Sequence, residues 1–225
     1  MAASRLRLAF FDLDGTLLDS ASSIVEGVRA CWSACGFPEP DPLQVRRIIG
    51  LPWEESIRAL IPDAGAAEFA KIRSYHDEVA RGLRPRPPRD QTLFPGAVET
   101  LDALEEAGYL LSIITSRSNG RLVDLLEQQG IAKRFVALKT VDHGPGKPSP
   151  HLMLQTLSET GVDAADAVMV GDTTFDILMA KNAGTAAVGV SWGVHERHEL
   201  TEAGAAHVVD AFHEIPPTLD RLTRG

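Results

Sequence analysis

The chain has 225 residues, a formal net charge of −9 at pH 7, 44% hydrophobic residues and 24% charged residues. This composition is ordinary for a globular protein with a buried core. Proteins that bind nucleic acid or anionic membranes usually have a basic surface, so the acidic balance argues against both partners. No apolar run reaches the roughly 18 residues that a membrane span requires.

The first residues do not resemble a secretory signal, because Asp12 and Asp14 interrupt the apolar stretch. A cytoplasmic protein is therefore predicted. The two cysteines, Cys31 and Cys35, are four residues apart and share one face of a predicted helix. Small buried side chains are the favoured interpretation over a disulfide.

The predicted elements of the first part of the chain are one strand followed by helices. An apolar run over 6–11 predicts a buried strand that ends at Asp12, and Asp14-Gly15-Thr16 predicts a turn. Asp19 and Ser20 can cap the helix that follows. Helices are predicted over residues 20–36, 43–49, 54–61 and 66–80.

A proline-rich segment over 82–96 separates this helical part from the rest. Its prolines forbid a helix and favour an extended tether. Its nearby arginines suggest either an anion site or a solvated linker, and we favour the linker; they are Arg81, Arg84, Arg86 and Arg89.

From residue 98 onward, helices alternate with short apolar strands. Strands are predicted over residues 109–114, 135–138, 167–170, 186–190 and 207–209. Helices are predicted over residues 98–107, 122–129, 149–160, 175–182 and 215–222. Continuously apolar strands alternating with helices indicate an α/β protein, with a Rossmann-like parallel sheet and helices on both faces. The predicted core covers residues 1–19 and 89–225, and residues 20–88 form an inserted, all-helical domain.

Polar side chains follow several of these strands, and the carboxyl ends of parallel strands meet at one sheet edge, where ligands bind. The first strand leads to Asp12 and Asp14, and a later strand leads to Thr115 and Ser116. Lys147 precedes a helix. Another strand leads to Asp172, with Asp176 four residues on. We therefore expect the three carboxylates at the strand ends to converge with a hydroxyl and an ammonium group, with Asp176 close by.

Each of these residues also has an ordinary structural interpretation. Asp12 and Asp14 can accept hydrogen bonds in a turn, and Thr115 can be a turn hydroxyl. Lys147 between Gly146 and Pro148 is typical of a solvated loop. Asp172 and Asp176 are also typical of a helix N-terminus. Only their joint placement at successive strand ends favours a site.

The predicted group of residues suits phosphate chemistry with Mg²⁺, which prefers carboxylate oxygens and keeps several waters. Asp12 can act as a carboxylate nucleophile, and Asp14 can exchange a proton with the leaving oxygen and with water. Lys147 can keep Asp12 ionised and neutralise phosphate oxygens.

Four motifs resemble those of the haloacid-dehalogenase-like phosphohydrolases, in the same order and over nearly the whole chain. They are FFDLDGTLLDS at 10–20, IITS at 113–116, GKPSP at 146–150 and VGDTTFDI at 170–177. The first motif is highly specific, whereas the second is weak alone and the last two gain weight from their order.

The resemblance implies a role for each matching residue. Asp12 would be the nucleophile and a Mg²⁺ ligand, and Asp14 would be the general acid/base and a ligand through its backbone carbonyl. Asp172 would bind the metal directly, and Asp176 would support its ligands. Phosphate would be bound by Thr115, Ser116 and Lys147. The helical insertion would be a mobile cap, with substrate contacts at Gly50, Leu51 and Pro52.

Within the family, the segment SWGVHERHEL and the helical insertion most resemble the phosphoglycolate phosphatases, although Val194 and the sequence TSR at 115–117 depart from them. A small phosphate monoester is the expected substrate. A mutase similar to β-phosphoglucomutase remains the enzymatic alternative. A receiver-like signalling module is the alternative from another class. Dehalogenation and phosphonate hydrolysis are disfavoured, because Asp14 is present.

Other residues carry weaker predictions. Trp53 and Arg58 are interpreted as packing or surface residues rather than substrate contacts. His143 and His195 are interpreted as solvated loop residues. Either a monomer or a homodimer is compatible with the sequence.

Overall fold

The computed structural model describes residues 5–85 and 91–223. Its centre is a six-stranded parallel sheet in the order β5-β4-β1-β6-β7-β8. The strands are β1 (Arg7–Phe11), β4 (Tyr109–Ile114), β5 (Phe135–Lys139), β6 (Ala167–Gly171), β7 (Ala186–Val190) and β8 (His207–Val209). Because all six are parallel, their carboxyl ends lie along one edge of the sheet.

Strand β1 shows why the sheet is covered on both faces. Leu8 and Phe10 are fully buried in one apolar cluster, whereas Ala9 and Phe11 are fully buried in another. Successive side chains of a strand point to opposite faces, so a strand buried on both faces must be apolar throughout. The continuous apolar runs in the sequence have this origin.

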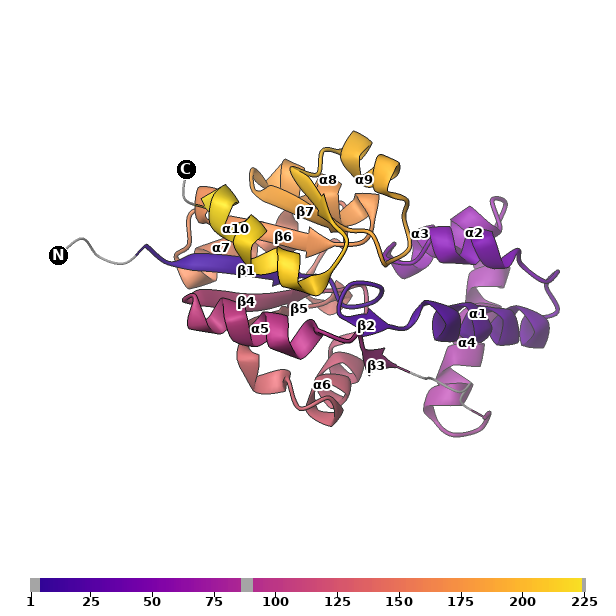
Figure 1. Cartoon of the computed structure of the whole chain (residues 1–225). Coiled ribbons are helices and arrows are strands. Elements are labelled where there is room, and N and C mark those ends of the chain that lie inside the picture. The colour runs from indigo at the N-terminus through magenta and orange to yellow at the C-terminus, as the bar shows by residue number, and fades with distance from the viewer. Residues whose placement is uncertain (1–4, 86–90, 224–225) are drawn as a thin grey trace.

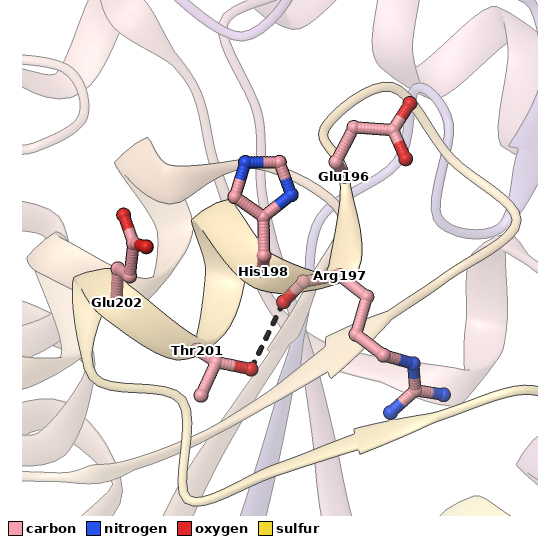
Figure 2. A pocket seen from close by; sticks show the side chains of 5 residues that line it. All are labelled: Glu196, Arg197, His198, Thr201 and Glu202. Carbon is pink, nitrogen blue, oxygen red and sulfur yellow. Dashed lines mark hydrogen bonds between the residues drawn. The ribbon is translucent and has the colours of Figure 1, made fainter.

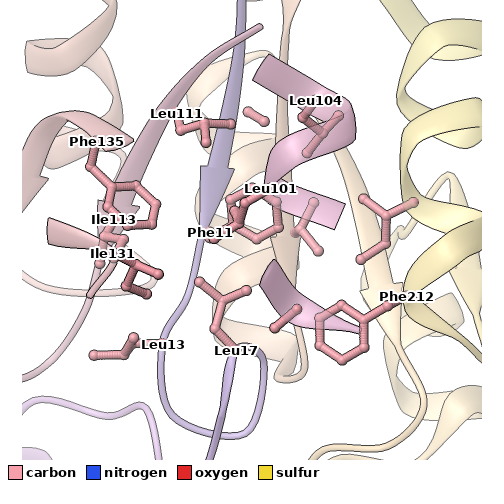
Figure 3. Close-up of a cluster of buried hydrophobic side chains, with 14 of the residues drawn as sticks. Phe11, Leu13, Leu17, Leu101, Leu104, Leu111, Ile113, Ile131, Phe135 and Phe212 are labelled. Carbon is pink, nitrogen blue, oxygen red and sulfur yellow. The ribbon is translucent and has the colours of Figure 1, made fainter. Parts of the chain in front are cut away.

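Three helices contribute to the cluster on each face of the sheet. Helices α5 (Ala97–Glu106), α6 (Asn119–Gln128) and α10 (Ile215–Thr223) contribute to the face that contains Phe11. Figure 3 shows this cluster around Phe11, Leu101 and Leu104. The opposite face is covered by α7 (His151–Thr160), α8 (Thr174–Ala183) and α9 (Arg197–Ala203).

The segment after β1 forms a separate helical group. It contains α1 (Ala21–Cys35), α2 (Pro42–Arg47), α3 (Trp53–Leu60) and α4 (Ala66–Ala80), which lie beyond the ends toward which the strands point (Figure 1). These helices have their own apolar cluster, which includes Trp32, Ile57 and Ile72. Two short strands, β2 (Leu18–Asp19) and β3 (Thr92–Leu93), pair antiparallel where the chain leaves and re-enters the core.

The predicted α/β class is confirmed, including the helices on both faces of a parallel sheet. Three features were not predicted from sequence: helix α9, the β2–β3 pair, and four short 3₁₀ turns at Ala132–Arg134, Val141–His143, Ala164–Asp166 and Phe212–Glu214. Residues 86–90 lie outside the described residues. The expected domain boundary at 88/89 and the arginines Arg86 and Arg89 fall within this segment. Within the described residues, no helix is long and apolar enough to cross a membrane.

The predicted role of Ser20 as a helix cap was wrong. Ser20 occupies the N-cap position of α1, but its side chain makes no capping hydrogen bond. Its hydroxyl donates instead to Asp14 Oδ1 at 2.5 Å. Cys31 is buried and Cys35 half-buried, and both are free thiols in the helical cluster, as predicted. Trp53 packs against Phe69, with Arg58 above the same Phe69 ring, in agreement with a packing role.

Removal of a core side chain tests this architecture. Leu101→Ala should lower the free energy of unfolding by about 2–5 kcal/mol, because Leu101 is fully buried between α5 and the sheet. Leu43→Ala is the control, since Leu43 is 69% exposed, and it should change stability by less than about 0.5 kcal/mol. Urea unfolding measures both, and equal effects would contradict the assigned core.

Candidate active site

The ends of the neighbouring strands β1 and β6 bring the first two acidic residues together. The amide of Asp12 donates to Val170 O at 3.0 Å and so extends the pairing of the two strands. Leu13 is fully buried in the core, and the chain turns back over Gly15. Asp172 follows directly on β6, which places it next to Asp12.

Three buried aspartates form a compact acidic cluster. One carboxylate oxygen from each of Asp12, Asp172 and Asp176 lies within 4.8 Å of the others. Burial raises the pKa of Asp12 to about 7, against the opposing effect of Lys147. Burial, together with the charges of Asp12 and Asp176, also raises the pKa of Asp172 well above its usual value. Bringing these negative charges together is unfavourable without a cation.

The donor set fits a divalent metal such as Mg²⁺. Asp12 Oδ2 is buried and has no hydrogen-bond partner among the described residues. A buried carboxylate oxygen without a donor is costly, and a metal ion would satisfy it. Hard carboxylate oxygens of this kind are the ligands that Mg²⁺ prefers. The side chain of Asp14 lies outside this cluster, so any contribution to the metal would have to come from its backbone carbonyl.

Lys147 is the cation that partly balances the cluster. Its Nζ lies 2.5 Å from Asp12 Oδ1 and 2.6 Å from Asp176 Oδ1, and the side chain is 1% exposed. Burial disfavours the charged amine, but the two carboxylates outweigh it and raise the pKa of Lys147. The interpretation of Lys147 as a solvated loop lysine is therefore wrong.

Asp172 is held on two sides by neighbouring loops. Thr16 Oγ1 donates to Asp172 Oδ1 at 2.9 Å, and the Val194 amide donates to Asp172 Oδ2 at 2.9 Å. A Cβ atom on Gly15 or Gly193 would lie 2.2 or 2.1 Å from Asp172 atoms, so only glycine fits at both positions. Asp172 is not the cap of α8, because Thr173 occupies that position.

Asp176 contacts both the N-terminus of α8 and the Lys147 side chain. Its Oδ2 accepts hydrogen bonds from Thr173 N and Thr173 Oγ1, which completes the capping box of α8. Its other oxygen, Oδ1, faces Lys147. The helix cap thus fixes the orientation of a side chain that belongs to the cluster.

Arg117 is the residue that the sequence interpretation missed. Its Nε donates to Asp14 Oδ2 at 2.6 Å and its Nη2 donates to Asp14 Oδ1, and both side chains are 12% exposed. Burial would raise the pKa of Asp14, but Arg117 and the Ser20 hydroxyl outweigh it and lower that pKa. The one available signal was the position of Arg117 directly after the predicted phosphate-binding residues.

Thr115 and Ser116 follow directly on β4, the strand next to β1. Thr115 is 2% exposed, and its amide donates to Lys139 O at 3.0 Å. The Ser116 hydroxyl donates to Gly50 O at 2.6 Å. One cavity is lined by Ser116, Gly50 and Leu51. The third residue of the turn, Pro52, lies close to Gly146, because a Cβ atom on Gly146 would be 3.1 Å from Pro52 Cγ. The turn 50–52 thus lies against the loops that follow the sheet.

The interpretation of His195 as a solvated residue was wrong, whereas His143 is exposed as predicted. His195 is 9% exposed, and its Nδ1 accepts a hydrogen bond from Thr174 N at 3.0 Å. Its Nε2 lies 3.3 Å from Arg47 O in the helical insertion. His195 follows Val194, so one loop contacts both Asp172 and α2.

A second hollow, of about 520 Å³, lies on α9, away from this group of residues. Its lining residues, labelled in Figure 2, are Glu196, Arg197, His198, Thr201 and Glu202. All five are exposed, and none belongs to the predicted site. The candidate active site is therefore the acidic cluster with the adjoining cavity.

The fold and this site define a family. A family model described as haloacid dehalogenase-like hydrolase matches residues 9–190, and the chain belongs to that family. A curated relative from Dickeya dadantii, named "Probable phosphatase IndB", is 37% identical over 92% of this chain and 91% of its own length. A phosphoglycolate phosphatase from Agrobacterium fabrum is 31% identical over 94% of this chain and 91% of its own length.

Solved structures share the fold. The crystal structure of a predicted phosphoglycolate phosphatase from Haemophilus somnus superposes with a TM-score of 0.82 at 23% identity, over 96% of this chain and 99% of that one. The predicted membership in the haloacid-dehalogenase-like family is thus confirmed. It also separates the chain from the receiver-like signalling modules that its acidic site resembles.

The raised pKa of Asp12 predicts a stabilising substitution. The pKa is about 7 in the folded, metal-free protein, whereas an aspartate free of such surroundings has a pKa of 3.8. The native state therefore binds more protons between these values and loses stability as pH rises through this window. Asp12→Asn cannot ionise, so at pH 8 with chelator it should be more stable than wild type by on the order of 1–3 kcal/mol. The difference should vanish toward pH 4, as measured by urea unfolding.

Asp14→Asn is the matched control with the opposite sign. The pKa of Asp14 is lower in the folded protein than in the unfolded chain, so ionised Asp14 stabilises the fold at pH values above its pKa in the unfolded chain. This contribution is lost as the pH falls through the pKa of Asp14 in the folded protein. Asp14→Asn should therefore destabilise the protein at pH 8. Destabilisation by both substitutions at pH 8 would contradict the electrostatic assignment of the cluster.

Proposed function

We propose that this phosphatase of the haloacid dehalogenase-like family hydrolyses a small phosphate monoester with Mg²⁺, through an aspartyl-phosphate on Asp12. The observation that supports this most is the state of the Asp12 carboxylate. One oxygen contacts Lys147, and the other is buried without a donor in the described part of the chain, in a cluster that also contains Asp172. Bound Mg²⁺ would offset the negative charge of the cluster and allow a phosphate to approach.

The residues of this chain then have defined tasks. Asp12 attacks phosphorus and forms the acyl phosphate, while the ester oxygen leaves with a proton from Asp14. Asp14, now ionised, takes a proton from the water that cleaves the acyl phosphate, which returns both residues to their starting state. Lys147, Thr115 and the Ser116 amide bind the phosphate oxygens during both steps.

For the metal, we propose Asp12, Asp172 and the Asp14 carbonyl as ligands, with Asp176 supporting them through Lys147. Supporting observations are the shared carboxylate distances of the cluster and the two hydrogen bonds that orient Asp172. Ligands held in place before the metal arrives lose little freedom on binding.

The substrate is proposed to bind between the core and a cap. Residues 20–88 would form the cap, and residues 1–19 and 89–225 the core. The separate apolar cluster of the helices supports this division. The cap would present Gly50, Leu51 and Pro52 to the substrate. A phosphoglycolate-like ester is the proposed substrate, in line with the name of the Agrobacterium relative.

We also propose that the enzyme acts in the cytoplasm, since both cysteines are free thiols in close contact on α1. Cytosolic proteins keep their thiols reduced. The mutase alternative uses the same acids, and it differs in whether water reaches the phosphorylated Asp12. The products of the reaction decide between the two.

Phosphate release from a panel of esters tests the chemistry. The panel holds 2-phosphoglycolate, β-glucose 1-phosphate, a nucleotide, pyrophosphate and p-nitrophenyl phosphate, each with Mg²⁺ and with chelator. We expect Mg²⁺-dependent release, strongest from 2-phosphoglycolate, and a loss of at least about 10³-fold in Asp12→Asn because the nucleophile is gone. Near wild-type turnover by a folded Asp12→Asn variant would refute the mechanism. Conversion of the sugar phosphate to an isomer without phosphate release would identify a mutase.

Removal of Asp172 tests the metal site. Asp172→Asn should weaken Mg²⁺ binding by about 10-fold or more, because an ionised ligand is replaced by a neutral one. Calorimetric titration of the substrate-free protein measures this without relying on turnover. Asp142→Asn, an exposed acid outside the cluster, serves as control. Unchanged Mg²⁺ affinity in Asp172→Asn would remove Asp172 from the ligand set.

A further inference from the structure

The cavity beside the acidic cluster is small and mostly apolar, and the helical insertion forms most of its wall. Its volume is about 170 Å³, below the roughly 300–1,000 Å³ of pockets that hold drug-sized ligands. The insertion contributes Ile24, Val28, Val45, Ile48, Ile49, Gly50, Leu51 and Ser56. The core contributes Asp14, Ser116 and Arg117. A small leaving group fits this space.

Arg117 is the only cation among the described residues of this lining, and its guanidinium is directed at Asp14. It forms two hydrogen bonds to the two oxygens of Asp14, and its Nη1 donates to Gln91 Oε1 at 3.1 Å. Gln91 is held in turn, because its carbonyl accepts a hydrogen bond from Gln129 Nε2 at 3.0 Å. The guanidinium is thus fixed at the cavity wall, and its planar pair of donors matches a carboxylate.

The pairing engages both carboxylate oxygens of Asp14. Oδ1 accepts from Ser20 and Arg117, and Oδ2 accepts from Arg117. In this arrangement the ester oxygen of a substrate must compete with the Arg117 guanidinium for both oxygens of Asp14. Separation of a buried ion pair is costly unless another charged group replaces the lost partner. A substrate that supplies a charged group favours the state in which Arg117 and Asp14 are separated. A neutral analogue does not bind that state better than the paired one, so it leaves the ion pair intact.

We propose that Arg117 recognises a carboxylate on the leaving group of the substrate, and that this carboxylate replaces Asp14 on the guanidinium. The released Asp14 then contacts the ester oxygen. The substrate class is a short phosphate ester whose alcohol carries a carboxylate. This inference rests on the proposed function, because it assigns Asp14 the proton transfer of that reaction.

A matched pair of substrates tests it. 2-Phosphoglycolate carries the carboxylate, and its carboxamide analogue has the same shape without the charge. p-Nitrophenyl phosphate, with a good leaving group, reports the phosphate chemistry alone. For wild type with Mg²⁺, kcat/KM should be about 100-fold higher for 2-phosphoglycolate than for the amide, as expected when charge-assisted hydrogen bonds are lost.

Arg117→Gln should bring this ratio close to one, mainly through a higher KM for 2-phosphoglycolate. Arg117→Lys should retain part of the preference, because it keeps the charge but not the paired donors. Arg134→Gln is the control, since Arg134 pairs with Asp102 and Glu105 on the surface, and it should keep the wild-type ratio.

An independent measurement uses the wild-type protein alone. Glycolate should inhibit hydrolysis of p-nitrophenyl phosphate at least about 10-fold more strongly than glycolamide. This comparison does not depend on the folding of any variant. Equal inhibition by both compounds, a wild-type ratio near one, or an unchanged ratio in folded Arg117→Gln would each overturn the inference. If wild type hydrolysed none of the three esters, the proposed function itself would fail. If it hydrolysed all three equally well, only the role of Arg117 would fail.

Discussion

The burial of three aspartates around Lys147 is the constraint on which the site depends. Asp12 and Asp172 directly follow the neighbouring strands β1 and β6, and Asp176 is fixed by the cap of α8. One ammonium cannot balance three carboxylates in a region of low dielectric, which is why burial raises the pKa of Asp12 and of Asp172. The same imbalance would favour the binding of a divalent cation at the cluster. The parallel sheet holds these charges together against their repulsion, since its buried faces supply the apolar packing.

The contacts between the core and the helical insertion include several polar ones. Ser116 donates to Gly50 O, His195 contacts Arg47 O, and the Arg47 side chain pairs with Glu199. The helices keep an apolar cluster of their own. Polar contacts of this kind can be exchanged for water at low cost, whereas a shared apolar core cannot. An insertion that opens and closes over the cavity is compatible with this division of contacts.

The sequence located the strands and most helices well, because apolar runs and glycine or proline stops report local structure. Strands β4, β7 and β8 have the predicted bounds. Helix α9 was missed, because this seven-residue segment is largely polar and has one fully buried side chain, Leu200. Ser20 was assigned to a helix cap on local grounds, but its hydroxyl serves Asp14, a preference that only the folded turn creates.

The sequence by itself determined the family, which polar residues follow which strand, and which aspartates belong to the site. These features follow from short motifs whose residues are close together in the sequence. The tertiary structure decided which partners those groups have. Arg117 lies 103 residues from Asp14 along the chain, and Lys147 lies between two aspartates from different elements. Ion pairs of this kind depend on distances across the fold, which no pattern along one chain encodes. The charge balance of the site, and the cation that faces its cavity, therefore emerge only when β1, β4 and β6 lie side by side.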